Sequence, residues 1–347
     1  MKKSMYRKMK VGIPSFVFYS AAFLILMIIV FSFLGNNTFF NIAQAHTATI
    51  PVGIGPFGIA YNPSNNNIYV ANAASSTVSV ISGSTNSVIA TPLVGRAPFW
   101  LVYVPNNQIY VTNGESNDVY VINAATNRVV KSIAVGTEPS GMAYDPTNNS
   151  VYVTNSANNT VSVINAATDI VVSTIPLGSS SGSGSDSATP DSTRPVMLAY
   201  DNDNDGLYVS KEPFAVSIIN AVTNAAVYDI TVDRDPTGIA YNPTNHNMYV
   251  AKFSSNEVSV IDTITNSVIG NIPVGNIPVD IVYNPINHNM YVTNLDSNTL
   301  SVIDSTTNSV IGTIPAGSAP YGIAYDSTNN HIYVTNPNSN TVTMIHP

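Results

Sequence analysis

The chain of 347 residues contains no cysteine, so neither a disulfide nor thiol chemistry contributes to its fold or function. Charged residues are also scarce, at 9% of the sequence. Five of the 12 basic residues lie within the first ten positions, so the remaining sequence has 7 basic and 20 acidic residues, a net charge of −13. This balance excludes the strongly basic surface that nucleic-acid binding requires.

A tetrapeptide, Tyr-Val-Thr-Asn or a close variant, occurs seven times. Its tyrosines are Tyr69, Tyr110, Tyr152, Tyr208, Tyr249, Tyr291 and Tyr333, with successive spacings of 41, 42, 56, 41, 42 and 42 residues. Seven prolines keep nearly the same spacing and open the units: Pro56, Pro98, Pro139, Pro195, Pro236, Pro278 and Pro320. A repeat of about 40 to 45 residues made of short strands is typical of a propeller blade.

One unit divides into four predicted strands, called A to D from the centre outward. In the unit that opens at Pro278, these strands cover residues 279–283, 290–293 and 299–303 and a run that begins at Ser309. Valine, isoleucine, threonine and tyrosine dominate them, and nothing in the unit fits a helix. A single four-stranded sheet cannot bury both of its apolar faces, so the units must stack.

The two ends of the repeat region predict a closed ring. Residues 341–346 form a strand C, and no strand D follows them. Residues 46–53 (HTATIPVG) resemble a strand D elsewhere in the chain, residues 311–317 (IGTIPAG). We therefore predict an all-β, seven-bladed β-propeller of four-stranded antiparallel blades, in which residues 47–53 complete the last blade and close the ring.

The predicted domain organisation is a leader over residues 1–45 and one propeller over residues 46–347. Basic residues at positions 2–10 precede an apolar stretch at 11–34, and Ala43-Gln44-Ala45 offers a cleavage site, which is typical of a signal peptide or signal anchor. Both alternatives place the propeller outside the cell, secreted or anchored by an N-terminal transmembrane segment. Residues 178–194, rich in serine and glycine, predict a flexible insertion between blades 3 and 4.

The charges of the repeats concentrate on one predicted rim, formed by the D-to-A and B-to-C loops. They are Arg96, Arg194, Arg234, Lys211, Lys252, Glu115, Glu138, Glu212 and Glu257. The A-to-B and C-to-D turns form the opposite rim, which is mainly Asn, Pro, Thr and Asp. A recognition surface is one interpretation of the charged rim. The other is that exposed loops tolerate charge.

Aromatic residues follow several of the unit-opening prolines and are expected at the mouth of the central funnel. Phe57, Phe99 and Tyr321 come from blades that are neighbours in the ring, and Trp100 is beside Phe99. Such an arc would stack on a sugar or hold a peptide, or it would serve packing between blades.

The sharpest local motif is the loop Asp-Asn-Asp-Asn-Asp-Gly at residues 201–206. Asp201, Asp203 and Asp205 with the Leu207 carbonyl resemble the calcium loops of integrin-type propellers, although Val209 stands where those usually carry a further acid. Glu212 completes an EF-hand spacing but lies too far away if the intervening chain is extended at about 3.3 Å per residue. The alternative is a plain Asp-Gly hairpin turn without metal.

The repeat motif resembles the YVTN family of β-propeller repeats, known from surface-layer and other cell-surface proteins of archaea and bacteria. Four copies match fully, ending at Asn113, Asn155, Asn294 and Asn336. The resemblance implies a surface location and a binding or structural role, and it implies no chemistry, because propellers host many unrelated functions.

We therefore expect an exported cell-surface binding or scaffold module that uses the charged rim and the funnel mouth. Its expected partner is a cell-surface protein or glycan, it requires no cofactor, and calcium is the one ion its sequence suggests. The alternative is an extracellular enzyme resembling propeller lactonases or lyases. That reading would need a His or Glu cluster on strand A, where the sequence offers mainly Asp280.

Overall fold

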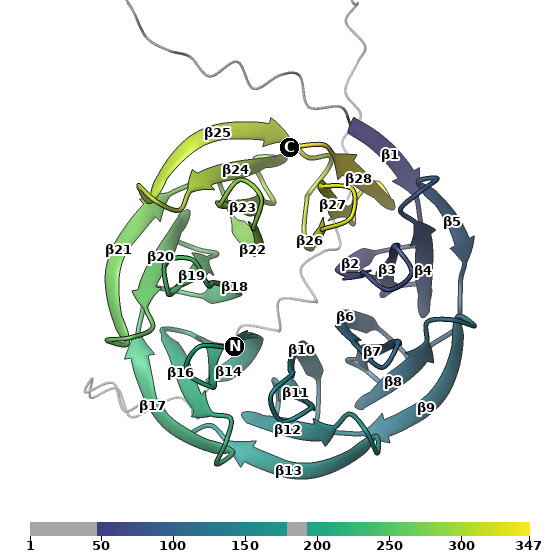
Figure 1. Cartoon of the computed structure of the whole chain (residues 1–347), viewed down its shortest axis with the longest axis horizontal. Helices are drawn as coiled ribbons and strands as arrows, with labels where there is room; N and C mark the ends of the chain where they lie inside the picture. Colours follow the sequence, from purple (N-terminus) through teal and green to yellow (C-terminus); the bar gives the residue numbers. More distant parts are fainter. Residues whose placement is uncertain (1–46, 179–192) are drawn as a thin grey trace, which may run out of the picture. The chain divides into compact units, whose positions relative to one another are not determined.

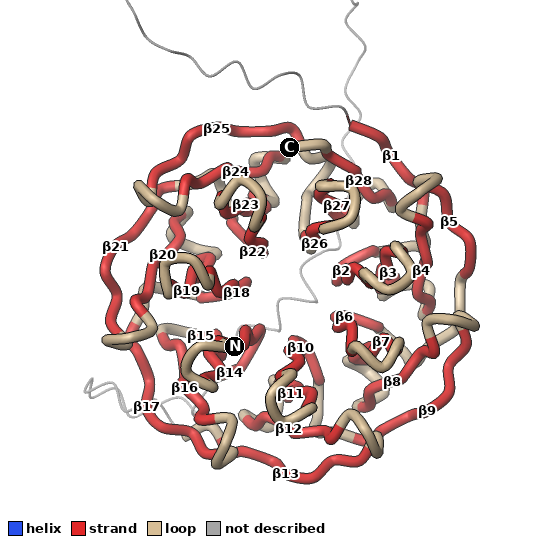
Figure 2. Tube along the Cα trace, viewed as in Figure 1, coloured by secondary structure: helices blue, strands red, loops and turns tan. Residues whose placement is uncertain are grey.

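The computed structural model describes residues 47–178 and 193–347, and their regular secondary structure consists of β-strands joined by short loops (Figure 2). No helix in this described part is long and apolar enough to cross a membrane. The predicted leader lies outside the described residues, and so does most of the predicted insertion, residues 179–192.

Seven four-stranded antiparallel sheets stand around a common centre, each with its strand A innermost (Figure 1). Blade 1 comprises β2 (Pro56–Asn62), β3 (Asn67–Asn72), β4 (Thr77–Ser82) and β5 (Ser87–Ala90). Blade 2 comprises β6 (Pro98–Val104), β7 (Gln108–Asn113), β8 (Asp118–Asn123) and β9 (Arg128–Ala134). Blade 3 comprises β10 (Pro139–Asp145), β11 (Ser150–Asn155), β12 (Thr160–Asn165) and β13 (Ile170–Pro176). Blade 4 comprises β14 (Arg194–Asp201), β15 (Gly206–Glu212), β16 (Ala215–Asn220) and β17 (Ala225–Thr231). Blade 5 comprises β18 (Pro236–Asn242), β19 (Asn247–Lys252), β20 (Glu257–Asp262) and β21 (Ser267–Pro273). Blade 6 comprises β22 (Pro278–Asn284), β23 (Asn289–Asn294), β24 (Thr299–Asp304) and β25 (Ser309–Pro315). The all-β, seven-bladed prediction is confirmed.

Blade 7 combines the two ends of the repeat region. It consists of β26 (Ile323–Asp326), β27 (His331–Asn336), β28 (Thr341–Ile345) and, outermost, β1 (Thr47–Pro51). β1 runs antiparallel to β28, with register from Thr47 opposite Ile345 to Pro51 opposite Thr341. The N-terminal strand therefore closes the ring, as the sequence predicts, and Figure 1 shows it lying outside β28.

The apolar core is divided among the joints between neighbouring blades. At the joint of blades 1 and 2, for example, Val78 and Val80 of β4 pack with Leu101, Ile109 and Val111 of the next blade. Equivalent clusters fill the other joints, including the joint between blades 7 and 1. Because each blade buries its faces against its neighbours, the packing of the ring is cooperative.

The repeated tyrosine on strand B joins each blade to the next one. Its hydroxyl donates a hydrogen bond to a turn residue between strands C and D of the following blade. These bonds are Tyr69 to Asn127 (3.2 Å), Tyr110 to Asp169, Tyr152 to Asn224 (2.8 Å), Tyr208 to Asn266 (2.5 Å), Tyr249 to Asn308 (2.6 Å) and, from blade 7 to blade 1, Tyr333 to Asn86 (2.8 Å).

Tyr291 in blade 6 is the exception, and ring closure explains it. Blade 7 takes its outermost strand from β1, so no turn connects its strands C and D. Among the described residues, the Tyr291 hydroxyl only accepts a hydrogen bond from Asn287 in its own blade (2.8 Å).

The turns explain why the chain is rich in asparagine. In one turn after another, a residue has a left-handed backbone, such as Asn66 (φ 57°) and Asn86 (φ 51°). Asparagine tolerates this conformation better than most residues with a Cβ atom. His246 (φ 57°) and His288 (φ 59°) occupy the position of Asn66 in blades 5 and 6.

Replacing Tyr333 with phenylalanine tests the bond that joins blade 7 to blade 1. We expect Tyr333→Phe to lower the free energy of unfolding by about 1 kcal/mol, because Asn86 loses a buried donor. Tyr291→Phe is the matched control and should cost clearly less, since no bond to a neighbouring blade is lost. Urea denaturation of both variants measures the difference, and equal losses would contradict this role.

Candidate functional site

Hydrogen bonds between loops define the two rims of the ring. The Gly114 N–H in a B-to-C loop donates to Ala97 O in a D-to-A loop (2.9 Å). On the other rim, the Ala124 N–H in a C-to-D turn donates to Asn107 O in an A-to-B turn (2.9 Å). The predicted grouping of loops is thus confirmed, and Arg96, Glu138 and Arg234 lie in loops of the first rim.

A group of rim residues around blade 4 departs from the repeat, and we call it the blade-4 patch. It consists of Glu138, Arg194, Glu212, Phe214 and Arg234. Arg194 at the start of β14 forms an ion pair with Glu138 from the loop before blade 3. The side chains of the two are 30% and 45% exposed, so the pair is accessible from solvent.

Glu212 ends β15 directly opposite Arg194. Burial and the negative charge of Asp235 raise the pKa of the Glu212 carboxyl, and Arg194 opposes this effect. The loop before blade 5 is attached here, because the Asp235 N–H donates to Pro213 O (2.8 Å). This bond joins the loop that carries the exposed Arg234 to Pro213, which lies between Glu212 and Phe214.

Phe214 is a patch residue that the sequence analysis did not select. Its side chain is 47% exposed at the tip of the loop between β15 and β16. In the other blades, the last residue of strand B that pairs with strand C lies five positions before its partner, as Asn72 does before Thr77. In blade 4 the corresponding pair, Lys211 and Ala215, is four positions apart. An alignment of the repeats would have revealed this shortened loop and its aromatic residue.

Lys211 and Lys252 differ from the expectation that they carry charge on the exposed rim. Both are fully buried. Lys211 donates to Asp229 (2.6 Å) and to Gly178 O (3.0 Å). Lys252 donates to Asp233 (3.0 Å), Glu257 (2.9 Å) and Asn271 (3.0 Å).

The two lysines replace the last asparagine of the repeat motif, which explains their burial. In blade 6 a glycine packs on that asparagine so closely that a Cβ atom on Gly275 would lie 2.6 Å from Asn294 Cγ. At the equivalent place in blade 4, Gly178 has open space around it, so a longer side chain fits. These lysines therefore hold their blades together rather than present charge to a partner.

The predicted aromatic arc is brought together at the centre of the ring. The Phe57 ring lies 4.9 Å from the Tyr321 ring and 5.7 Å from the Phe99 ring, and Trp100 packs on Phe99 at 6.1 Å. Phe99 is only 4% exposed and Tyr321 only 8%. The rings thus pack mainly on one another, and binding of a sugar or peptide by this arc stays a prediction.

Tyr321 also connects the centre to the blade-4 patch. Burial raises the pKa of its phenol, and the negative charges of Asp280 and Glu212 add to the shift. The carboxylate of Glu212, from blade 4, is therefore close enough to the centre to influence a side chain of blade 7.

Asp280 is buried on β22 and joins blade 6 to blade 7. One carboxylate oxygen accepts the Ile281 N–H (2.9 Å) and the other accepts the Ile323 N–H of β26 (3.0 Å). Burial raises the pKa of Asp280 to about 7, although the two N–H donors lower it. Blade 5 has Gly238 at this position, where an added Cβ would lie 2.5 Å from Val279 O.

The raised pKa of Asp280 predicts how stability changes with pH. The folded protein binds this proton more tightly than the unfolded chain, so unfolding becomes easier as the pH rises through about 7. We expect the melting temperature to fall between about pH 4 and about pH 7, and Asp280→Asn to flatten that decline. Asp296→Asn, at an exposed site in the same blade, should leave it intact. A decline that Asp280→Asn preserves would contradict this assignment.

The carboxylates of the proposed calcium loop have separate partners. Asp201 Oδ1 accepts the Asp203 N–H (2.9 Å), Asp203 Oδ2 lies 3.0 Å from His246 Nδ1, and Asp205 accepts a hydrogen bond from the Tyr200 hydroxyl (2.7 Å). Leu207 is buried in β15. The described residues include no group of three or more His, Cys, Asp or Glu side chains that would hold a metal ion. Asp201 Oδ2 is buried and has no hydrogen-bond partner among the described residues, and calcium binding at this loop stays a prediction.

The fold and its rims define a seven-bladed β-propeller. Among solved structures, the chain is similar to a chain of hydrazine synthase from Kuenenia stuttgartiensis, with a TM-score of 0.73 and 19% sequence identity over 84% of this chain and 96% of that chain. No family model and no curated protein matches the sequence. At this identity the likeness shows the fold alone, so membership in the YVTN family stays a prediction.

Proposed function

We propose that the protein is an exported cell-surface binding or scaffold module that holds a partner on its charged rim. The observation that carries the proposal is the blade-4 patch. Residues that depart from the repeat gather there, and they include an exposed aromatic side chain and an accessible ion pair. Conspicuous side chains of this kind on a rigid repeat scaffold are typical of recognition surfaces.

The chemistry of the patch suits a polar partner with an apolar contact point. Phe214 offers a ring that stacks on a sugar or on an apolar side chain. Elsewhere in the patch, the guanidinium groups of Arg194 and Arg234 can donate hydrogen bonds to a partner, and the carboxylates of Glu138 and Glu212 can accept them. A cell-surface glycan or a protein loop presents complementary groups, which agrees with the partner classes expected from the sequence.

The packing of the ring supports a scaffold role as well. Aromatic rings from blades 1, 2 and 7 pack on one another at the centre, and Asp280 of blade 6 accepts an N–H of blade 7. The blades are therefore held together near the axis, and the tyrosine hydrogen bonds join them again near the opposite rim. This support presents the loops of the charged rim. Binding to a preorganised surface of this kind loses little conformational entropy.

The test is a glycan and peptide array probed with the purified full chain, followed by affinity measurements on the ligand it captures. We expect Phe214→Ser to weaken that binding by about tenfold or more, because the ligand loses its contact with the exposed aromatic ring of the patch. Ile264→Ser is the matched control. It changes an apolar side chain, 76% exposed, in a turn of the opposite rim and should leave the affinity unchanged.

Two results would contradict the proposal. One is capture of a ligand whose affinity both variants leave unchanged. The other is catalytic turnover of a lactone or uronide substrate that Phe214→Ser does not affect and Asp280→Asn abolishes, which would favour the enzyme alternative.

A further inference from the structure

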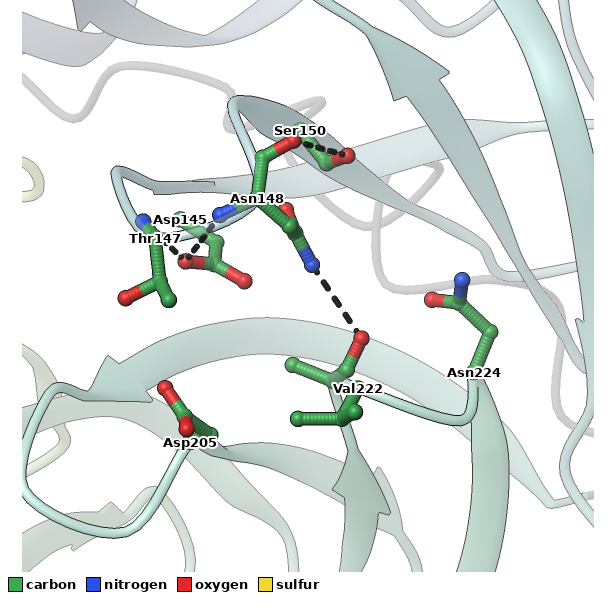
Figure 3. A pocket seen from close by; sticks show the side chains of 8 residues that line it. Asp145, Thr147, Asn148, Ser150, Asp205, Val222 and Asn224 are labelled. Carbon is green, nitrogen blue, oxygen red and sulfur yellow. Dashed lines mark hydrogen bonds between the residues drawn. The ribbon is translucent and has the colours of Figure 1, made fainter.

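The opposite rim contains a cavity between blades 3 and 4, built by turns of both. Its volume is about 280 Å³. The A-to-B turn of blade 3 contributes Asp145, Thr147 and Asn148, and blade 4 contributes Asp205, Val222 and Asn224 (Figure 3). None of these residues belongs to the blade-4 patch, so the cavity is a separate feature of the molecule.

Asp145 in this cavity has a carboxylate oxygen without a partner. The residue is 1% exposed, and its Oδ1 accepts the N–H groups of Thr147 (2.8 Å) and Asn148 (3.4 Å). Its Oδ2 is buried and makes no hydrogen bond within the described part of the chain. Figure 3 shows that this second oxygen is turned away from the bonded turn, toward the side of the cavity where Val222 lies. Buried carboxylate oxygens are normally paired, so this atom lacks a donor.

Two further groups around the cavity, on Asp205 and Asn224, have acceptor positions that are not fully used. Asp205 forms no ion pair with any residue in the described ranges, and its bonded oxygen accepts only the Tyr200 hydroxyl (2.7 Å). Asn224 Oδ1 accepts the Tyr152 hydroxyl (2.8 Å) and has a second lone pair. Both donors of the Asn148 amide are already used, because its Nδ2 donates to Ala221 O (3.1 Å) and to the Tyr152 hydroxyl (3.1 Å). The cavity thus combines two carboxylates with no basic side chain in its lining.

We propose that this cavity binds a primary alkylammonium group. An ammonium supplies three N–H donors and one positive charge, which match the carboxylates of Asp145 and Asp205 and the amide oxygen of Asn224. Ala221 and the 71% exposed Val222 provide an apolar wall for the methylene stem. A lysine side chain of another protein and a free alkylamine share this chemistry.

The chain itself supplies variants that remove the charge and keep the fold. Asn62, Asn242 and Asn284 stand at the position of Asp145 in blades 1, 5 and 6, and each caps its turn in the same way, as Asn62 does with the Ser64 N–H (2.9 Å). Asp145→Asn should therefore fold normally. Asp326 holds the same position in blade 7, but its second oxygen accepts the Asn329 amide (2.9 Å), so Asp326→Asn is a matched control.

The experiment is calorimetric titration of the full chain with pentylamine at neutral pH, with pentanol as the neutral analogue of equal length. We expect saturable binding of pentylamine and none of pentanol. Asp145→Asn should weaken amine binding by about tenfold or more, because a charge-assisted hydrogen bond is lost. Asp326→Asn should leave it unchanged. Melting temperatures of the variants confirm that they are folded.

Further titrations separate the two sources of the amine from other ligands. Stronger binding of a lysine-containing peptide than of pentylamine supports a protein partner, and equal or weaker binding supports a free amine. The proposal is overturned if pentanol binds as well as pentylamine, if Asp145→Asn binds the amine like the wild type, or if pentylamine does not bind at all. Calcium that binds in place of the amine and is lost in Asp145→Asn would assign the cavity to a metal instead.

Discussion

The antiparallel pairing of β1 with β28 is the contact on which the rest of the structure depends. The chain has no disulfides, and a blade has two apolar faces that only neighbouring blades can cover. Without β1, blade 7 would lack its outer strand and β28 would become an open edge. With it, the first and last parts of the repeat region belong to one sheet, and every blade has a neighbour on each side. The joint of blades 7 and 1 then has the same kind of apolar cluster as the other joints.

The repeat separates positions that maintain the ring from positions that are free to vary. Strand-B tyrosines, the asparagines that end the motif and the glycines packed on them perform the same task in blade after blade. Where the motif changes, either another structural solution replaces it or an exposed residue is introduced. Lys252 with its three polar partners is the first case, and Phe214 in its shortened loop is the second. Function is therefore best sought where a departure from the repeat is also exposed, as in the blade-4 patch, or leaves a polar atom unpaired, as at Asp145.

The sequence predicted the fold well because it contains seven copies of the same local pattern. Strand limits in blade 6 agree within about a residue with β22 to β25, and the predicted closing segment pairs as β1. Side-chain environments at the joints were harder to predict, because they depend on residues one or more repeats away. The burial of Lys211, the packing of Phe99 on rings from other blades and the bond from Asp280 to Ile323 are contacts of this kind. The spacing of the three aspartates at 201–205 predicted convergence, whereas the turn directs them to different neighbours.

A single crosslink tests ring closure most directly. Thr49 in β1 lies opposite Thr343 in β28, and the chain has no other cysteine to compete with an engineered pair. After mild oxidation, Thr49→Cys combined with Thr343→Cys should form an intramolecular disulfide in nearly every molecule and raise the melting temperature, because the bond closes a loop that spans almost the whole ring. Thr49→Cys combined with Thr335→Cys in β27, two strands away, should keep its thiols free. Free thiols in the first pair, or disulfides only between molecules, would contradict closure of the ring by β1.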